Sequence, residues 1–297
     1  MLQKILFGTL SVAMLLGCSP SPSEPKQNSS FTFLFMTDLH LRPGVAERSF
    51  EIVVDTALTM NADFVLTGGD LIFDAMRGNV ARTDSLYDLY KRSVARLNMP
   101  VYPAIGNHDL FGIYAESDID STHADYKFGM FRRQFGDDYY HFPHKGWHFF
   151  VLNGFDTEAY RWVARFGSEQ LQWLVRKLET IGPNEPICIV VHVPVATMYD
   201  YFNTRQDAIP AAEAVYHDHK TFMDLFDGHN LRLVLQGHKH WIEEIRVRNK
   251  TSFITGGSVA GRPSWGATPN GEEGFLKITV DGEQADWEYI YYQRITE

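Results

Sequence analysis

Short β-prone runs alternate with longer amphipathic segments over residues 31–235. The runs predict strands at 31–36, 64–66, 101–105, 147–152, 186–191 and 231–235. Between them, residues 46–60, 83–97, 168–181 and 216–226 have the apolar spacing of helices. Ser168 is a suitable N-cap for the third helix, because an apolar stripe from Leu171 to Leu178 follows it. This alternation predicts an α/β fold.

The remainder of the chain has the pattern of an all-β meander, with predicted strands at 244–248, 252–254, 275–280 and 287–292. Alternation followed by a meander predicts two packed mixed β-sheets flanked by helices, formed as one domain by residues 31–297. Two long segments, 110–142 and 194–215, lack a clear period and directly follow predicted strands. We expect them to be irregular loops that cover a site.

The first 30 residues differ from the rest and predict export. Lys4 precedes an apolar run of 12 residues, 5–16, which is too short for a bilayer core that needs about 20. Residues 1–17 therefore have the pattern of a secretory signal peptide. Residues 18–30 form a linker rich in Pro and Ser.

Leu15-Leu16-Gly17-Cys18 resembles the lipobox of bacterial lipoproteins. That resemblance implies cleavage before Cys18, lipidation of its thiol and anchoring to the cell envelope. Ser19 after the cysteine implies the outer membrane if the cell is Gram-negative. The alternative is an ordinary signal peptide followed by an incidental cysteine.

Composition narrows the possible partners. The 44% hydrophobic and 22% charged residues are typical of a globular protein, and the net charge of −10 argues against nucleic acid as a partner. We expect membrane contact only through the lipid anchor, and the oligomeric state stays open. Two cysteines exclude a disulfide framework, and Cys188 lies in an apolar run that predicts a buried thiol.

Residue types that bind metals follow five of the predicted strands. The motifs are Asp38-Leu39-His40, Gly69-Asp70, Gly106-Asn107-His108-Asp109, His192 and Gly237-His238-Lys239-His240. In α/β sheets such residues gather at the carboxyl ends of strands. In near-extended backbone residues i and i+2 point the same way, so Asp38 and His40, or His238 and His240, can share one centre. One histidine after a strand is ordinary, but five such motifs in series predict a metal site.

This ordered set resembles the calcineurin-like metallophosphoesterase superfamily over Asp38 to His240. The resemblance implies an αββα sandwich, in agreement with the pattern above. It also implies two metal ions, the first held by Asp38, His40, Asp70 and His240. The second would be held by Asp70, Asn107, His192 and His238, with Asp70 bridging. Mixed carboxylate, amide and imidazole ligands suit Mn, Fe or Zn and do not choose among them.

The same resemblance implies hydrolysis of phosphoester bonds by a hydroxide that two cations share. His108 matches the family histidine that acts as general acid or transition-state stabiliser, and the alternative is a supporting role behind the ligands. Asp109 is placed to bind the other ring nitrogen of His108 and to fix its tautomer.

Two departures indicate the subgroup. Phe73 stands where purple acid phosphatases have Tyr, and residues 69–75 lack the Asp-Arg-Gly run of protein serine/threonine phosphatases. The chain most resembles bacterial class III cyclic-nucleotide phosphodiesterases and related enzymes. An exported member needs an extracytoplasmic substrate, so we expect a small nucleotide or glycerophosphodiester. The alternatives are an exported phosphomonoesterase and a catalytically inactive binding or scaffold protein.

Substrate contacts are predicted from placement alone. In the first long segment these are Phe111, Tyr114, Arg132 and Arg133. Residues 256–266 resemble a glycine/tryptophan loop of exported family members. Its Trp265 would stack on a substrate or pack against the protein.

Overall fold

Strands β1 (Phe31–Met36) and β2 (Phe64–Thr67) are buried on both faces along nearly their whole length, which explains their unbroken apolar runs. In the computed structural model, which describes residues 30–203, 216, 219–260 and 273–292, they lie in the middle of a five-stranded sheet. Its order is β13-β12-β1-β2-β3, with β3 at Val101–Pro103, β12 at Gly274–Asp281 and β13 at Gln284–Tyr291. Strands β1, β2 and β3 are parallel, β12 pairs antiparallel with β1, and β13 pairs antiparallel with β12 at the edge.

A second sheet of six strands has the order β10-β11-β9-β8-β5-β4. These strands are β4 (Tyr140–His144), β5 (Trp147–Val151), β8 (Pro186–Val190), β9 (Asn230–Gln236), β10 (Glu243–Val247) and β11 (Thr251–Thr255). Here β5, β8, β9 and β11 are parallel, and β4 and β10 are antiparallel edges. The two mixed sheets confirm the predicted sandwich.

Aromatic side chains fill the space between the sheets. Phe33 and Phe64 stack with ring centroids 5.1 Å apart, and Phe149 from the facing sheet meets Phe33 edge-on at 5.4 Å. Such ring pairs add about 0.5–1.5 kcal/mol beyond the burial of area. The neighbouring residues of β1, Leu34 and Met36, instead belong to the core that the helices form with the outer faces.

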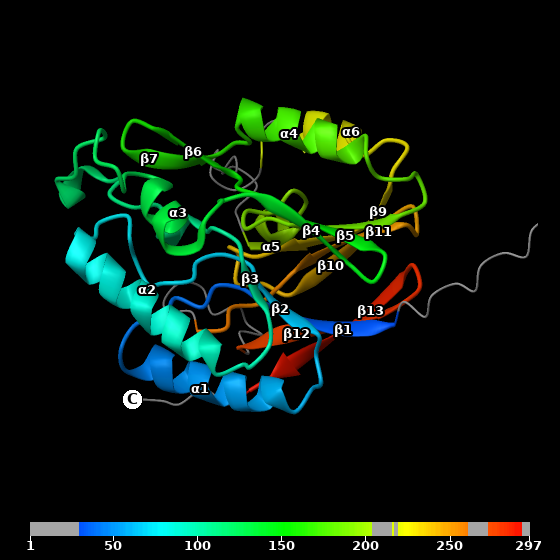
Figure 1. Ribbon diagram of the computed structural model, residues 1–297, viewed down its shortest axis with the longest axis horizontal. Helices are drawn as coiled ribbons and strands as arrows, with labels where there is room; N and C mark the ends of the chain where they lie inside the picture. The colour runs from blue at the N-terminus through cyan, green and yellow to red at the C-terminus, as the bar shows by residue number, and fades with distance from the viewer. Residues whose placement is uncertain (1–29, 204–215, 217–218, 261–272, 293–297) are drawn as a thin grey trace, which may run out of the picture.

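Helices cover both outer faces (Figure 1). Helices α1 (Val45–Leu58) and α2 (Val80–Ala95) lie over the first sheet, and α4 (Ser168–Leu178) and α6 (His219–Asp224) lie over the second. Two further helices, α3 (Gly129–Phe135) and α5 (Tyr199–Asn203), lie in the connections. The N-cap of α4 is Gly167, so Ser168 is the first helical residue and makes no capping hydrogen bond. The last predicted helix begins only at His219.

The first long segment is only partly irregular, which corrects the expectation from its weak periodicity. It contains the 3₁₀ turn η2 (Ala115–Ser117), helix α3 and the start of β4. The antiparallel hairpin of β6 (Phe155–Glu158) and β7 (Arg161–Ala164) was also not predicted from the sequence. This hairpin forms a small third sheet. Its strands of four residues are too short to give a clear period.

The tip of this hairpin is strained, because Ala159 and Tyr160 both have positive φ, at 46° and 61°. Left-handed backbone costs side chains other than Gly about 1–2 kcal/mol, and two-residue loops of this kind favour Asn-Gly. We therefore expect the double change Ala159→Asn and Tyr160→Gly to raise the free energy of unfolding by about 1 kcal/mol. Thermal denaturation should show this as a Tm about 2–4 °C higher.

Tyr160→Phe is the matched control for this change, since the ring at position 160 is 68% exposed and its backbone would stay left-handed. It should leave Tm unchanged. An equal rise in Tm for the control, or no rise for the Asn-Gly variant, would contradict the strain at the tip.

The described part of the chain includes no helix that is both long and apolar enough to cross a bilayer. Cys188 is fully buried on β8, as its apolar run predicts, and burial raises the pKa of its thiol. The predicted signal peptide, Cys18, nearly all of the linker and Trp265 lie outside the described residues.

Candidate metal centre

The five sequence motifs meet at the carboxyl ends of the parallel strands. Asp38 and His40 follow β1, Asp70 follows β2, and His192 follows β8. The 3₁₀ turn η1 (Asn107–Asp109) after β3 carries Asn107, and the loop after β9 carries His238 and His240. Asp38, His40, Asp70, Asn107 and His192 are all buried, with at most 5% of the residue exposed.

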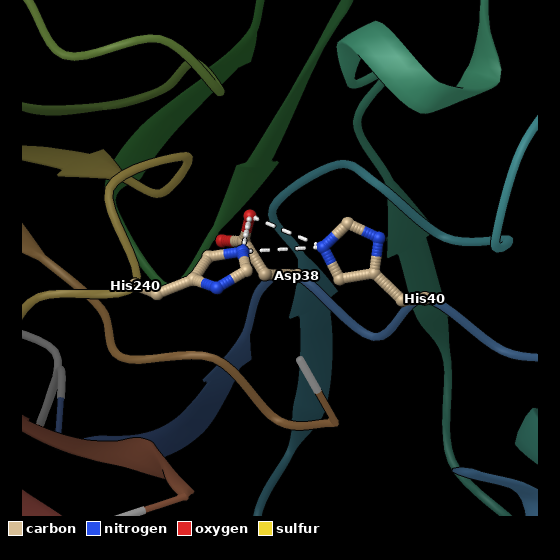
Figure 2. A group of neighbouring side chains, drawn as sticks. All are labelled: Asp38, His40 and His240. Atoms are coloured by element: carbon tan, nitrogen blue, oxygen red, sulfur yellow. Dashed lines mark hydrogen bonds and ion pairs between the residues drawn. The ribbon is translucent and has the colours of Figure 1, made fainter. Parts of the chain in front are cut away.

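Asp38, His40 and His240 form the first group (Figure 2). His240 Nε2 lies 3.1 Å from Asp38 Oδ1 and 3.2 Å from His40 Nε2, although the two histidines are 200 residues apart in the chain. Figure 2 shows the two imidazoles pointing toward each other beside the carboxylate. Two imidazole nitrogens and a carboxylate oxygen that converge in this way form three sides of a metal site.

The second group is formed by Asp70, Asn107, His192 and His238. His192 Nε2 lies 3.2 Å from Asp70 Oδ2, and His238 Nδ1 lies 3.0 Å from Asn107 Oδ1. Asp70 Oδ2 is also 3.7 Å from His40 Nε2 of the first group. The Asp70 carboxylate therefore lies between the two groups, where a bridging ligand would lie.

The second group contains a buried atom that suits a cation. His192 Nδ1 lies 2.8 Å from the carbonyl of Gly68, which can only accept, so this nitrogen donates. His192 Nε2 therefore faces the two buried carboxylates, at 3.2 Å from Asp70 Oδ2 and 3.8 Å from Asp38 Oδ1. A buried imidazole nitrogen beside carboxylates and an amide is a donor set that suits Mn, Fe or Zn.

Electrostatics inside the centre favour positive charge. Burial raises the pKa of Asp38 and of Asp70, but the neighbouring histidines, His192 foremost, outweigh it and hold both pKa values below the usual range. Burial lowers the pKa of His192, but Asp70 and Asp38 outweigh it and raise that pKa to about 9. Burial and then His192 lower the pKa of His238 to about 3. The carboxylates thus stay ionised and attract a cation.

The backbone of the ligand motifs is not near-extended, which corrects the expectation from sequence. Asp38, His40, Asp70, His238 and His240 all have positive φ, between 44° and 71°. Such backbone costs about 1–3 kcal/mol per residue and persists only where the surroundings fix it. Here the Ser258 hydroxyl donates to the carbonyl of Asp38 at 2.9 Å, and the His40 amide donates to the carbonyl of Asp70 at 2.8 Å.

Two glycines of the motifs permit the close approach of the loops. A Cβ atom at Gly106 would lie 2.0 Å from the amide nitrogen of Asp70. At Gly237 it would lie 2.1 Å from Thr37 Oγ1 and 2.6 Å from Asp38 Oδ2. Any side chain at either position would push a predicted ligand away from the centre.

His108 lies against this centre, with its ring perpendicular to that of His40 at a centroid distance of 4.8 Å. Its amide donates to Asp70 Oδ1 at 2.8 Å, and its Nδ1 donates to the carbonyl of Phe73. Nε2 is therefore the ring atom that can exchange a proton. His40, Asp70 and His108 also form a third group of ligand-type atoms.

Asp109 does not bind His108, which corrects the predicted pairing. Its carboxylate accepts from the amides of Gly106 at 2.8 Å and Leu71 at 3.2 Å, and from the Tyr87 hydroxyl at 3.3 Å. Burial, and then the charge of Asp70, raise its pKa to about 7. Asp109 therefore holds the loops that carry the ligands, and the Phe73 carbonyl fixes the tautomer of His108.

The predicted substrate contacts have partners elsewhere. Arg132 Nε donates to Asp138 at 2.6 Å, and Arg133 binds both Asp125 and Asp84. Phe111 is fully buried, which removes it as a contact. The ring of Tyr114 lies under the guanidinium of Arg77 at 4.1 Å.

Sequence reasoning missed several residues that touch the centre. Thr37 donates to the Asp38 carboxylate at 2.7 Å, and Phe155 and Trp162 of the hairpin contact the predicted ligands His192 and His238. Thr37 adjoins the first motif, which is a signal that could have found it. The hairpin lies far from every motif in sequence and gave no such signal.

Comparison with known proteins identifies the family to which this arrangement belongs. A sequence model described as Calcineurin-like phosphoesterase matches residues 31–241, which is more than half of the chain. The chain belongs to the calcineurin-like phosphoesterase family. This member is accordingly a phosphoester hydrolase, and among the described residues its Asp and His side chains form groups that could hold metal ions. No curated protein matches the sequence significantly.

Two solved structures are similar to this family member in fold. A dimetal phosphatase from Danio rerio has 14% identity and a TM-score of 0.60, over 90% of this chain and all of that one. GAP50, the anchor in the inner membrane complex of Plasmodium, has 14% identity and a TM-score of 0.57, over 88% of this chain and 84% of that one. At such identity the likeness concerns the fold alone.

Proposed function

We propose that this hydrolase is a dinuclear-metal phosphodiesterase that acts on small extracytoplasmic substrates of the nucleotide or glycerophosphodiester type. The observation that carries the proposal is the complete set of seven ligand side chains, with Asp70 between two groups. Two bound cations would supply Lewis acidity and neutralise the phosphoryl oxygens.

In this proposal each group of side chains holds one ion. Asp38, His40 and His240 hold the first ion, and Asn107, His192 and His238 hold the second. Asp70 contributes to both. His108 stays on the substrate side, because its Nδ1 is engaged by Phe73 and its Nε2 can donate a proton to the leaving oxygen.

Features of the sequence support the proposed location and substrate class. A signal peptide at 1–17, a lipidated Cys18 and a polar linker would place the enzyme outside the cytoplasm on the cell envelope. The net charge of −10 favours a small substrate over a nucleic acid. The residues around Phe73 and Asp74 favour the small-diester subgroup.

One observation supports a second candidate function, that of a scaffold protein. GAP50 shares the fold and is described as an anchor, so this fold also serves a protein with a scaffold role. The complete ligand set favours the enzyme, because a scaffold has no need of two metal ions. Metal content and hydrolysis, measured together, therefore separate the enzyme from the scaffold.

The test compares kcat/KM of the full-length chain, purified in mild detergent and loaded with Mn²⁺, for bis-p-nitrophenyl phosphate and p-nitrophenyl phosphate. We expect a preference for the diester of at least about tenfold, or 1.4 kcal/mol in transition-state binding. A preference for the monoester would make the protein a phosphomonoesterase. Two bound metal ions without hydrolysis of either compound would reject both enzyme functions.

A further inference from the structure

The hairpin of β6 and β7 contributes two aromatic rings to one side of the metal centre. Trp162 meets the ring of His238 edge-on at 5.2 Å, and Phe155 lies 6.1 Å from the ring of His192. His192 and His238 are themselves 5.4 Å apart, and Phe155 and Trp162 are 5.7 Å apart. The four rings therefore form a closed circuit, with two hairpin side chains against two of the predicted ligands.

Several contacts fix this hairpin on the body of the protein. At its base, Asn153 exchanges two hydrogen bonds with Gln170 of α4, at 2.9 and 2.6 Å. Lys127 bonds Asp156 of β6 at 2.6 Å. Phe155 and Trp162 are 3% and 6% exposed, so both rings are held inside. The hairpin is thus a rigid support for the rings.

The circuit restricts the imidazole of His238 from two sides. The Trp162 ring stands at 87° to it, and the His192 ring at 74°. Both rings pack against the imidazole, whose Nδ1 lies 3.0 Å from Asn107 Oδ1. Apolar rings packed against a ligand also exclude water, which strengthens the bond between a nitrogen and a cation.

The first group of ligands lies outside the circuit. The rings of His40 and His240 contact each other at 5.2 Å, and the ring of His40 contacts that of His108. Neither histidine is part of the hairpin circuit. A change in the hairpin should therefore reach one metal subsite and spare the other.

We propose that Trp162 is a positioning residue that holds the imidazole of His238 for the second metal ion and sets the affinity of that subsite alone. The inference rests on the proposed dinuclear site and goes beyond it by assigning the support of one subsite to the hairpin.

The experiment measures metal binding and needs no turnover. Full-length chain in mild detergent is stripped with chelator and titrated with Zn²⁺ against a fluorescent competitor, which gives a Kd for each of two equivalents. Trp162→Ala should weaken one equivalent by about 10–100-fold and leave the other unchanged, as losses of supporting residues around a metal usually do. Trp162→Phe, which keeps a ring, should restore most of the affinity.

Trp173→Ala is the matched control, because Trp173 on α4 packs against Tyr139 at 5.1 Å and Phe150 at 6.0 Å, and no contact with a predicted ligand is part of its packing. It should lower Tm and leave both Kd values as in the wild type. If Trp162→Ala does not fold, Trp162→Leu replaces it, with the same expected loss at one equivalent.

Three outcomes would decide against the inference or its basis. If both Kd values of the Trp162→Ala or Trp162→Leu protein equal those of the wild type, Trp162 is an ordinary core residue with no role in positioning His238. Equal weakening of both equivalents would show a general loss of packing and would also overturn it. A wild-type chain that binds fewer than two ions would refute the proposed dinuclear site itself, so the two failures are distinguishable.

Discussion

Replacing Asp70 with Asn is expected to lower kcat/KM for a phosphodiester by about 10³-fold or more, and to reduce the metal content below two ions per chain. The carboxylate lies 3.2 Å from His192 Nε2 and 3.7 Å from His40 Nε2, so it touches both ligand groups. An amide of the same shape keeps the packing but removes the negative charge that each cation would share. The measurements are steady-state kinetics and elemental analysis of the dialysed protein.

Asp138→Asn is the matched control for this change. Asp138 is also buried, but its carboxylate binds Arg132 and Asn153 and belongs to no ligand group. The control should lower Tm, because the buried Asp138 loses the charge that pairs with Arg132. It should retain two metal ions and wild-type turnover. An Asp70→Asn protein that keeps both ions and full activity would contradict the bridging position.

Replacing His108 with Ala is expected to reduce kcat by about 10²–10⁴-fold while two metal ions stay bound. The Phe73 carbonyl engages Nδ1, so Nε2 is the atom that would give a proton to the leaving oxygen. The loss should therefore be largest for diesters with alkyl leaving groups. It should shrink for p-nitrophenyl esters, whose leaving group needs no proton.

The competing role for His108 is that of a metal ligand, because its ring forms a third group with His40 and Asp70. Elemental analysis of the His108→Ala protein decides between the two roles. Loss of an ion would make His108 a ligand and would remove it as proton donor. An equal loss of kcat for alkyl and p-nitrophenyl diesters would also count against proton donation.

The layers of the fold could be predicted from the local pattern of apolar and polar residues. Strands that are buried on both faces give unbroken apolar runs, as in β1 and β8, and helices on the outer faces give a stripe such as Phe50, Val53 and Val54 of α1. The hairpin of β6 and β7 has neither signal. Its strands hold four residues each, and its tip uses Ala159 and Tyr160 where a turn pattern would have Asn and Gly.

The hydrogen-bond partners of Asp109 show why the details of the site were harder to predict from the sequence than the fold was. Adjacency in sequence favoured a bond to His108, but η1 turns the carboxylate inward to Gly106, Leu71 and Tyr87. Buried carboxylates take the nearest amide and hydroxyl donors in space. Which donors those are depends on where α2 and the loop after β2 pack.

By itself, the sequence predicted the α/β fold with two packed sheets and placed the candidate ligand residues at strand ends, because strand periods and the residues that follow strands are local properties of the chain. Tertiary structure alone decided how those side chains meet. His40 and His240 come within 3.2 Å across 200 residues, Asp38 takes a left-handed backbone, and Trp162 reaches His238 from a hairpin. Each of these depends on contacts between distant segments, and the packing of two sheets against each other fixes those contacts.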